Sequence, residues 1–491
     1  MSESVRNVLV IFVLFLAYSI FSNPQMYISL SRKRFISYKF FNLRLRNFSY
    51  EKPRHLNKIF ILIPILREAF QITFRSQNIR KFLKSLTNNN SLQYESIYTR
   101  IVKQRFNPKY PYLTSGDHFS SFYPRNLGLF YSQALIPENT LNLLDYQNRL
   151  TTYLNSLHFC LEFFENQKIT TTIVPIFRSI FYSANIYREP SDSLLSIMLS
   201  LDRLINPKDY NYQTPDVQYQ SSQDQASKFG LELLEEYKLD LYAKILDLLA
   251  KINLNESLFD KKYSFSGIRD GIIRYQCFYD NICLWKTLKL AIKLEIISTN
   301  ELEEFETLSS ISKNIRKKFI NLIIYDTDKK DLSADFLIAY SVGFLKTGNQ
   351  DEAKILLATI KEFDKNKLIH PLGIQYSNIN SPQTQWLVKL ICPSYMGKSI
   401  WSHWSVELGM LCLDLVRDKN TNQISNDDIN YLLEIVKNIT KNTDKKILQY
   451  QGYPELYNSQ GKIFSNLFYS SILQTGWIVN YNWLKINLKK L

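Results

Sequence analysis

Glycine, cysteine and histidine are all scarce in this chain of 491 residues, and each shortage excludes a class of protein. The 13 glycines fall well below the usual share of about 7%, which disfavours collagen-like chains and β architectures with many turns. The five cysteines are odd in number and widely spread, so they predict neither a disulfide framework nor a paired metal site. The five scattered histidines are too few for a metal cluster. We therefore expect no metal and no cofactor.

The motifs of the common nucleotide and hydrolase sites are also missing. The chain has no GxGxxG after a strand, no GxSxG elbow and no HExxH. Gly397-Lys398-Ser399 ends like a phosphate-binding loop, but Cys392 stands where that motif needs its first glycine. The sequence thus disfavours dinucleotide binding, phosphate-loop chemistry and the zinc peptidases.

The apolar content is high and its spacing is helical. Hydrophobic residues make up 45% of the chain, aromatic residues 14% and charged residues 21%, which excludes a disordered protein. Apolar positions recur at intervals of three and four, as on the buried face of a helix. About twelve helices are predicted: one beginning near Tyr123, and others near 141–164, 169–187, 191–205, 231–249, 281–297, 299–324, 333–347, 350–363, 402–417, 427–443 and 464–485. The fold class is therefore all-α.

Positive charge is concentrated at the N-terminal end. The net charge is +15, and residues 1–110 contain 19 Lys and Arg against 4 Asp and Glu, whereas residues 111–491 contain 41 of each sign. This asymmetry favours contact with an anionic membrane surface or an acidic partner. A solvated basic face that packs on the main domain is the alternative. Nucleic-acid binding is a weaker possibility, and we expect none.

The run Val8–Phe21 is uncharged and apolar over 14 residues. As a helix it would be about 21 Å long, against a hydrocarbon core of about 30 Å. We predict an uncleaved anchor and a membrane-associated protein; a secretory signal peptide is the alternative. Six Lys and Arg between residues 32 and 46 would keep the main body on the cytoplasmic side, whereas a signal peptide would place it on the other. The side of the membrane stays open.

These patterns divide the chain into three parts. Residues 1–30 form the hydrophobic segment, 31–110 the basic N-terminal region and 111–491 the main helical domain. Two long aromatic loops, 209–224 and 368–399, are expected within that domain, and such loops often carry function. A single helical hairpin at Ala339–Leu357 leaves an α-solenoid as an alternative, although a solenoid needs about three repeats.

Three segments place carboxylates among aromatic, glycine and proline residues. Asp117 follows Gly116, Asp270 lies between two glycines, and Glu455 follows Pro454. Glycoside hydrolysis needs one protonated carboxylic acid and one carboxylate, with aromatic rings to stack on the sugar. Each carboxylate also has a structural interpretation: a helix cap for Asp117, a helical pair with Arg274 for Asp270, and a surface turn for Glu455.

Taken in order, these motifs resemble the six-hairpin glycosidases, the superfamily of glucoamylases, trehalases and processing α-glucosidases. Tyr123-Pro124-Arg125-Asn126 is similar to their early aromatic-Pro-Arg-Asp motif, and Ser266–Asp270 to the Ser-Gly motif that bears their general acid. Tyr453–Tyr457 is similar to their Pro-Glu-aromatic loop, which bears the catalytic base. Ile400–Glu407 resembles the Trp-rich helix start that lines their sugar pocket. Asn126 and Arg269 replace acidic residues of these motifs.

The resemblance implies an (α/α)6 toroid over residues 111–491 that hydrolyses α-linked glycosides. Asp270 would be the general acid and Glu455 the base, and inversion requires about 6.5–9.5 Å between their carboxyl groups. A non-catalytic toroid that binds carbohydrate or serves as a scaffold is the alternative. The implied substrate-binding residues are Asp117, Phe119, Tyr123, Arg125, Arg274, Trp401, Trp404 and Glu407.

Overall fold

The computed structural model gives the arrangement of most of the chain from residue 28 onward. The residues that it describes are 28–40, 43–50, 54–55, 59–86, 92–108, 113–114, 116, 121–138, 141–165, 169, 172–177, 180–184, 190–210, 217–263, 265, 272, 276–297, 302–320, 332–379, 392–419, 423–466 and 468–491.

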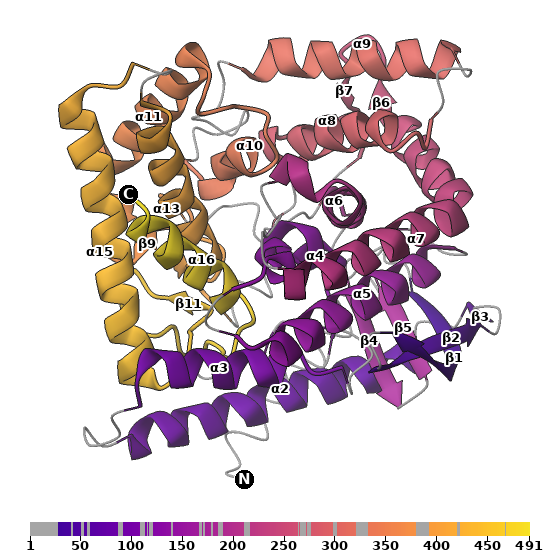
Figure 1. Ribbon diagram of the computed structural model, residues 1–491, viewed down its shortest axis with the longest axis horizontal. Helices are drawn as coiled ribbons and strands as arrows, with labels where there is room; N and C mark the ends of the chain where they lie inside the picture. Colours follow the sequence, from indigo (N-terminus) through magenta and orange to yellow (C-terminus); the bar gives the residue numbers. More distant parts are fainter. Residues whose placement is uncertain are drawn as a thin grey trace.

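Twelve helices of the described chain follow one another round a ring (Figure 1). They alternate between an outer and an inner layer, which makes the main body an (α/α)6 toroid. The outer helices are α3 (Tyr94–Arg105), α5 (Leu143–Glu165), α7 (Val217–Leu249), α9 (Leu302–Phe319), α11 (Gln350–Lys365) and α15 (Asn426–Tyr450). The inner helices are α4 (Pro124–Phe130), α6 (Ser193–Ile205), α8 (Phe278–Lys293), α10 (Leu337–Ser341), α13 (Ser402–Arg417) and α16 (Ile478–Lys489).

The two layers differ in how their apolar residues are distributed. The inner helices α4 and α6 are buried on almost every side, and all seven residues of α4 are buried. The outer helix α15 buries only one stripe, which includes Leu432, Ile435, Val436 and Ile439. A helix that is apolar all round needs neighbours on every side, whereas an amphipathic helix faces solvent with its polar side. The sequence of each helix therefore selects its layer.

Inner helices pack side by side and run in the same direction. The Tyr279 hydroxyl donates to Asp192 Oδ2 at 3.0 Å, which joins the N-terminal ends of α8 and α6. Arg417 donates to the Asn487 side chain at 2.7 Å, which joins the C-terminal ends of α13 and α16. The N-termini of the inner helices therefore lie at one end of the toroid, together with the loops that precede them.

A buried ionic network closes the ring between its first and last helices. Glu138 accepts hydrogen bonds from Arg149 Nη1 on α5 at 2.7 Å and from Asn482 Nδ2 on α16 at 2.7 Å. The Tyr98 hydroxyl on α3 donates to the same carboxylate. Arg149 is fully buried, so this charge pair is stable only while every partner is present.

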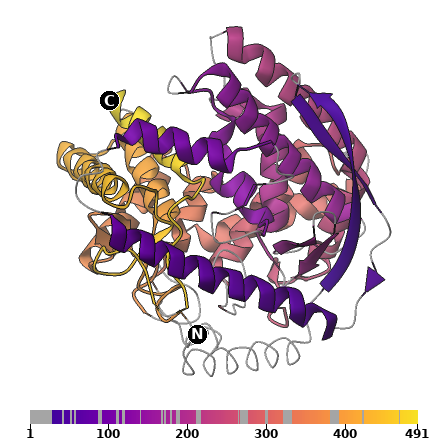
Figure 2. The same cartoon turned by 90° about the horizontal axis from the view of Figure 1, so that it is seen from below.

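The N-terminal part adds a long helix beside the ring and three strands that form a sheet with β4 and β5 from the segment between α5 and α6 (Figure 2). Within the sheet β2 pairs with β1, β1 with β5 and β5 with β4, all antiparallel, and β3 also pairs with β1. The strands are β1 (Ile28–Phe40), β2 (Leu43–Tyr50), β3 (Arg54–His55), β4 (Thr172–Phe177) and β5 (Ile180–Ala184), and the helix is α2 (Ile59–Ser85). Helix α3 lies before residue 111, yet it packs on α5, α15 and α16 as the first outer helix of the ring.

Three short strand pairs and three 3₁₀ helices lie between the helices. The strands are β6 (Ile252–Asn253), β7 (Leu258–Phe259), β8 (Ile369–His370), β9 (Gly373–Ile374), β10 (Ile400–Trp401) and β11 (Leu456–Tyr457). The 3₁₀ helices are η1 (Ser132–Leu135), η2 (Pro207–Tyr210) and η3 (Ala334–Phe336).

Three expectations from the sequence are wrong. The stretch 169–187 is not a helix, because β4 and β5 lie there. The last helix begins at Ile478 rather than near residue 464, since the residues before it form a loop that pairs with Glu455 and Tyr453. The expected loop 209–224 becomes part of α7 from Val217 onward.

No helix among the described residues is long and apolar enough to cross a membrane. The hydrophobic run Val8–Phe21 lies outside the described residues.

Candidate active site

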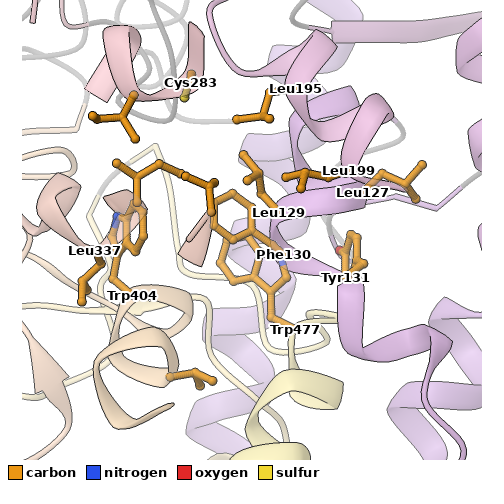
Figure 3. Close-up of a cluster of buried hydrophobic side chains, with 14 of the residues drawn as sticks. Leu127, Leu129, Phe130, Tyr131, Leu195, Leu199, Cys283, Leu337, Trp404 and Trp477 are labelled. Atoms are coloured by element: carbon orange, nitrogen blue, oxygen red, sulfur yellow. The ribbon is translucent and has the colours of Figure 1, made fainter. Parts of the chain in front are cut away.

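The N-terminal ends of α13 and α16 bring three aromatic side chains, His403, Trp404 and Trp477, against Phe130, the last residue of α4. The His403 ring lies 4.4 Å from the Phe130 ring, 4.7 Å from Trp477 and 5.0 Å from Trp404, between ring centroids. Trp401 lies 5.5 Å from His403. These five residues are called the aromatic cluster below. Figure 3 shows three of them, Phe130, Trp404 and Trp477, within the buried core.

Four polar atoms of the aromatic cluster have no hydrogen-bond partner in the part of the chain that the structure describes. They are Nδ1 and Nε2 of His403, Nε1 of Trp404 and Nε1 of Trp477. Each of these side chains is at most 3% exposed. A buried donor or acceptor without a partner costs about 1–3 kcal/mol, so such atoms usually have a bound molecule or water as their partner. The cluster therefore has the polar groups of a binding site.

His403 is uncharged in this environment. Burial holds the pKa of its imidazole well below the usual value, and the positive charge of Arg125 lowers it further. A neutral imidazole presents one donor and one acceptor. Together with the two indole N–H groups, the cluster offers three donors and one acceptor, which suits a neutral ligand rich in hydroxyl groups.

The loop that carries Glu455 is fixed to the start of α13. Strand β11 pairs with β10, so that Leu456 lies opposite Trp401. The backbone N–H and the hydroxyl of Ser402 both donate to the carbonyl oxygen of Glu455, at 3.0 and 2.8 Å. The N–H of Glu455 donates to the carbonyl of Ile472 at 3.0 Å. These bonds place Glu455 next to the aromatic cluster, although more than fifty residues separate it from Trp401.

The Glu455 side chain is 4% exposed. Its Oε2 accepts a hydrogen bond from the Tyr469 hydroxyl. Burial raises the pKa of the Tyr131 hydroxyl, Arg105 opposes the rise, and the nearby Glu455 carboxylate adds to it. Tyr131 follows Phe130 in the chain, so the carboxylate and the cluster adjoin at the end of α4.

Two further residues predicted from the sequence lie at the start of α4. Arg125 is 5% exposed, and its guanidinium lies 5.4 Å from the centre of the Tyr123 ring. Because its charge acts on His403, Arg125 is a neighbour of the aromatic cluster. The structure thus brings Tyr123, Arg125, Trp401, Trp404 and Glu455 to one end of the toroid.

Trp401 and Glu407 make specific contacts within the ring. Trp401 Nε1 donates to the carbonyl of Tyr395 at 2.9 Å. Glu407 lies one helical turn beyond His403 and accepts a hydrogen bond from the Ser341 hydroxyl at 2.7 Å. Burial raises the pKa of Glu407, while the Ser341 hydrogen bond and the charge of Arg203 oppose the rise.

Four of the predicted site residues, Asp117, Phe119, Asp270 and Arg274, lie outside the described residues. One neighbour of Asp117 is described: a Cβ built on Gly116 would lie 2.5 Å from Ile472 Cδ1. Because the Ile472 carbonyl accepts from the N–H of Glu455, Gly116 lies beside the Glu455 loop.

The structure adds residues that sequence reasoning did not select. Asp335 lies in η3, just before α10, and accepts a hydrogen bond from the Tyr376 hydroxyl at 2.9 Å. The Tyr376 ring lies 6.1 Å from Trp401. His403 and Trp477 also join the site. His403 falls within the Trp-rich segment Ile400–Glu407, and Trp477 directly precedes the apolar start of α16, but neither was selected as a site residue.

In the described part of the chain, no group of three or more His, Cys, Asp and Glu side chains is placed to hold a metal ion. The described cysteines Cys160, Cys277, Cys283, Cys392 and Cys412 are free thiols.

No protein-family model and no curated protein matches the sequence of this chain. Its structure is similar to that of a rhamnosidase from Klebsiella oxytoca with rhamnose bound, with a TM-score of 0.45 and 10% sequence identity. The similarity covers 81% of this chain, which spans 64% of the length of that rhamnosidase chain. An identity of 10% says nothing of which ligand this chain binds.

Proposed function

We propose that this protein is a glycoside hydrolase that acts on α-linked glycosides at the N-terminal end of its inner helices. The aromatic cluster carries this proposal. It combines flat apolar rings, on which the apolar faces of a sugar stack, with four polar atoms that lack a partner among the described residues. The neutral His403 favours a neutral polyol over an ionic ligand.

Glu455 is the proposed general base. A base must lie within hydrogen-bond reach of the water that it activates, and Glu455 adjoins the cluster in which the sugar would lie. Its backbone is held at both ends by hydrogen bonds to Ser402 and Ile472. These backbone bonds fix the position from which the Glu455 side chain extends.

The proposed general acid is Asp270, by its resemblance to the Ser-Gly motif of the six-hairpin glycosidases. In an inverting reaction, this acid protonates the leaving oxygen while Glu455 removes a proton from the attacking water on the opposite face of the sugar. In this step the glycosidic C–O bond breaks and its oxygen takes the proton of Asp270, while the water oxygen bonds to the anomeric carbon and its released proton passes to Glu455.

A non-catalytic sugar-binding toroid is the second candidate, because Asn126 and Arg269 stand where the resembling motifs have acidic residues. A turnover measurement distinguishes the hydrolase from the non-catalytic sugar-binding protein. Full-length protein in detergent is incubated with trehalose, maltose and short α-glucans, and released reducing sugar is measured for the parent and for Glu455→Gln. Release by the parent and a loss of at least about 100-fold in Glu455→Gln support hydrolysis.

Sugar binding without release, equal in the parent and in Glu455→Gln, would favour the non-catalytic candidate. Glu138→Gln is not a suitable control, because Glu138 belongs to the network that closes the ring. Glu362→Gln is the matched control: this partly exposed glutamate lies on the outer helix α11, where it pairs with Lys365, and its substitution should leave release unchanged.

A further inference from the structure

The hydroxyl of Tyr469 donates a hydrogen bond to the Glu455 carboxylate. Tyr469 lies in the loop before α16, fourteen residues beyond Glu455, and is 5% exposed. Burial raises the pKa of its hydroxyl well above the usual value, and the Glu455 charge raises it further. The hydroxyl therefore keeps its proton over the whole working pH range and remains a donor.

The Tyr469 ring is held in place by its neighbours. Tyr395 lies 5.4 Å from it in an edge-to-face arrangement, and Phe464 lies 6.1 Å away. The N–H of Tyr469 donates to the Asn466 side chain at 2.9 Å, which forms a tight turn just before it. Because the Tyr469 side chain is held in place, its hydroxyl can donate to the Glu455 carboxylate in one orientation only.

Helix α2 holds the Tyr469 loop from outside the ring. The Arg80 guanidinium donates to the Asn466 carbonyl. The fully buried Ser76 hydroxyl accepts from the N–H of Ser470 at 3.0 Å. Ile79 packs in a small apolar core with Ile400, Tyr457 and Leu473, which flank the Glu455 loop. The N-terminal helix thus braces the loop on which Tyr469 stands.

Three other titratable groups lie near this pair: Tyr131, Arg105 and Cys392. The hydroxyl of Tyr131, after α4, is directed to the Thr114 carbonyl at 3.5 Å. Arg105, at the end of α3, acts on Tyr131 by its charge and donates to Thr114 Oγ1 at 3.3 Å. Cys392 faces Tyr469, and burial raises the pKa of its thiol to about 12.

We infer that Tyr469 is a positioning residue for Glu455: its hydroxyl fixes one carboxylate orientation and favours the ionised form, and α2 holds the loop that supplies it. The inference rests on the proposed function only for its effect on turnover. A hydrogen bond to an ionised acceptor stabilises that form over the protonated one. Loss of the Tyr469 hydroxyl therefore makes Glu455 easier to protonate.

The test compares Tyr469→Phe with Tyr457→Phe. Tyr457 is a matched control, because it lies two residues from Glu455 and is buried, and its hydroxyl has no hydrogen-bond partner in the described chain. In Tyr469→Phe the acid limb of kcat/KM should move up by about one pH unit or more, whereas in Tyr457→Phe it should stay in place. Ser76→Ala should move it in the same direction by less.

A second readout does not depend on turnover. In protein labelled with ¹³C at the glutamate δ-carbons, the Glu455 signal is identified by its loss in Glu455→Gln, and its titration is followed in each variant. The midpoint should rise by the same amount in Tyr469→Phe. If it does not move, the positioning role is wrong. If it moves but no sugar is hydrolysed, the positioning role holds and the proposed hydrolase function fails.

Discussion

Substitution of His403 by phenylalanine tests whether the aromatic cluster is built for a ligand rather than for stability. His403 is 2% exposed, and neither ring nitrogen has a hydrogen-bond partner among the described residues. Phenylalanine keeps a ring among Phe130, Trp404 and Trp477 and removes both nitrogens. We expect His403→Phe to lose sugar binding and to gain stability relative to the parent as the pH falls.

The size of the effect follows from protonation. The pKa of His403 is held well below its usual value in the folded chain, first by burial and then by Arg125, whereas the unfolded chain has an ordinary histidine near pH 6.5. Below that pH, the unfolded parent binds a proton that the folded parent does not, so the parent loses stability as the pH falls. At about 1.4 kcal/mol per pH unit, the variant should gain about 2 kcal/mol on the parent between pH 6.5 and pH 5.

The larger ring of phenylalanine adds a packing cost of about 1–3 kcal/mol, but this cost is the same at every pH. The pH dependence of the stability difference between variant and parent therefore reports the protonation of the imidazole, separate from the packing cost. With an unfolding entropy of about 2.1 cal/mol/K per residue, a chain of this length has about 1 kcal/mol/K in total, so 2 kcal/mol corresponds to about 2 °C in Tm. Urea unfolding curves at several pH values resolve this difference better than thermal scans.

His158→Phe is the matched control. His158 is also a buried histidine among aromatic rings, but Glu162 Oε1 lies 3.7 Å from its Nε2. Substitution there removes a partner of a carboxylate and should not reproduce the gain at low pH. A stability difference between His403→Phe and the parent that is flat from pH 7 to pH 5 would refute the account of the cluster, and so would unchanged sugar binding.

Three further predictions concern ring closure, helix packing and the N-terminus. Arg149→Met leaves the buried Glu138 carboxylate without its cation, and should cost about 3–5 kcal/mol in urea unfolding; a loss below 1 kcal/mol would contradict this. Gly128→Ala places a Cβ 2.0 Å from the Ser196 carbonyl oxygen, so its Tm should fall by several degrees, whereas an unchanged Tm would show that α4 and α6 separate freely. Leu14→Arg should cost about 3 kcal/mol of membrane insertion and shift the full chain out of the membrane fraction on flotation; an unchanged distribution would argue against the proposed anchor.

The fold was predictable where each helix keeps one apolar pattern from end to end. Helix α13 begins and ends at the predicted residues 402 and 417, because Trp404, Leu408 and Leu411 repeat at helical spacing with no proline between them. The spacing misled at 169–187, where Ile173 and Val174 fit a helical stripe while the threonines before them favour a strand. Apolar spacing depends only on which positions are apolar. It therefore does not register the preference of β-branched residues for an extended backbone.

The site was predictable in part, for a different reason. Glu455, Trp401 and Arg125 were predicted to lie together because proline, aromatic and charged residues mark loops and helix starts; the structure brings them to one end of the toroid, and their roles stay predictions. His403 and Tyr469 were missed because what distinguishes them is tertiary: unpartnered nitrogens in one case and a hydroxyl aimed at a carboxylate in the other. No local pattern in the sequence encodes either property.

The anomeric configuration of the first product tests the central claim most directly. Proton NMR of the anomeric region is recorded within the first minutes of reaction of the full-length protein with the best of the α-linked substrates, beside Glu455→Gln. The account predicts the inverted anomer from the parent and no new anomeric signal from Glu455→Gln. A retained anomer, or equal turnover by the two proteins, would contradict Glu455 as the base of an inverting hydrolase.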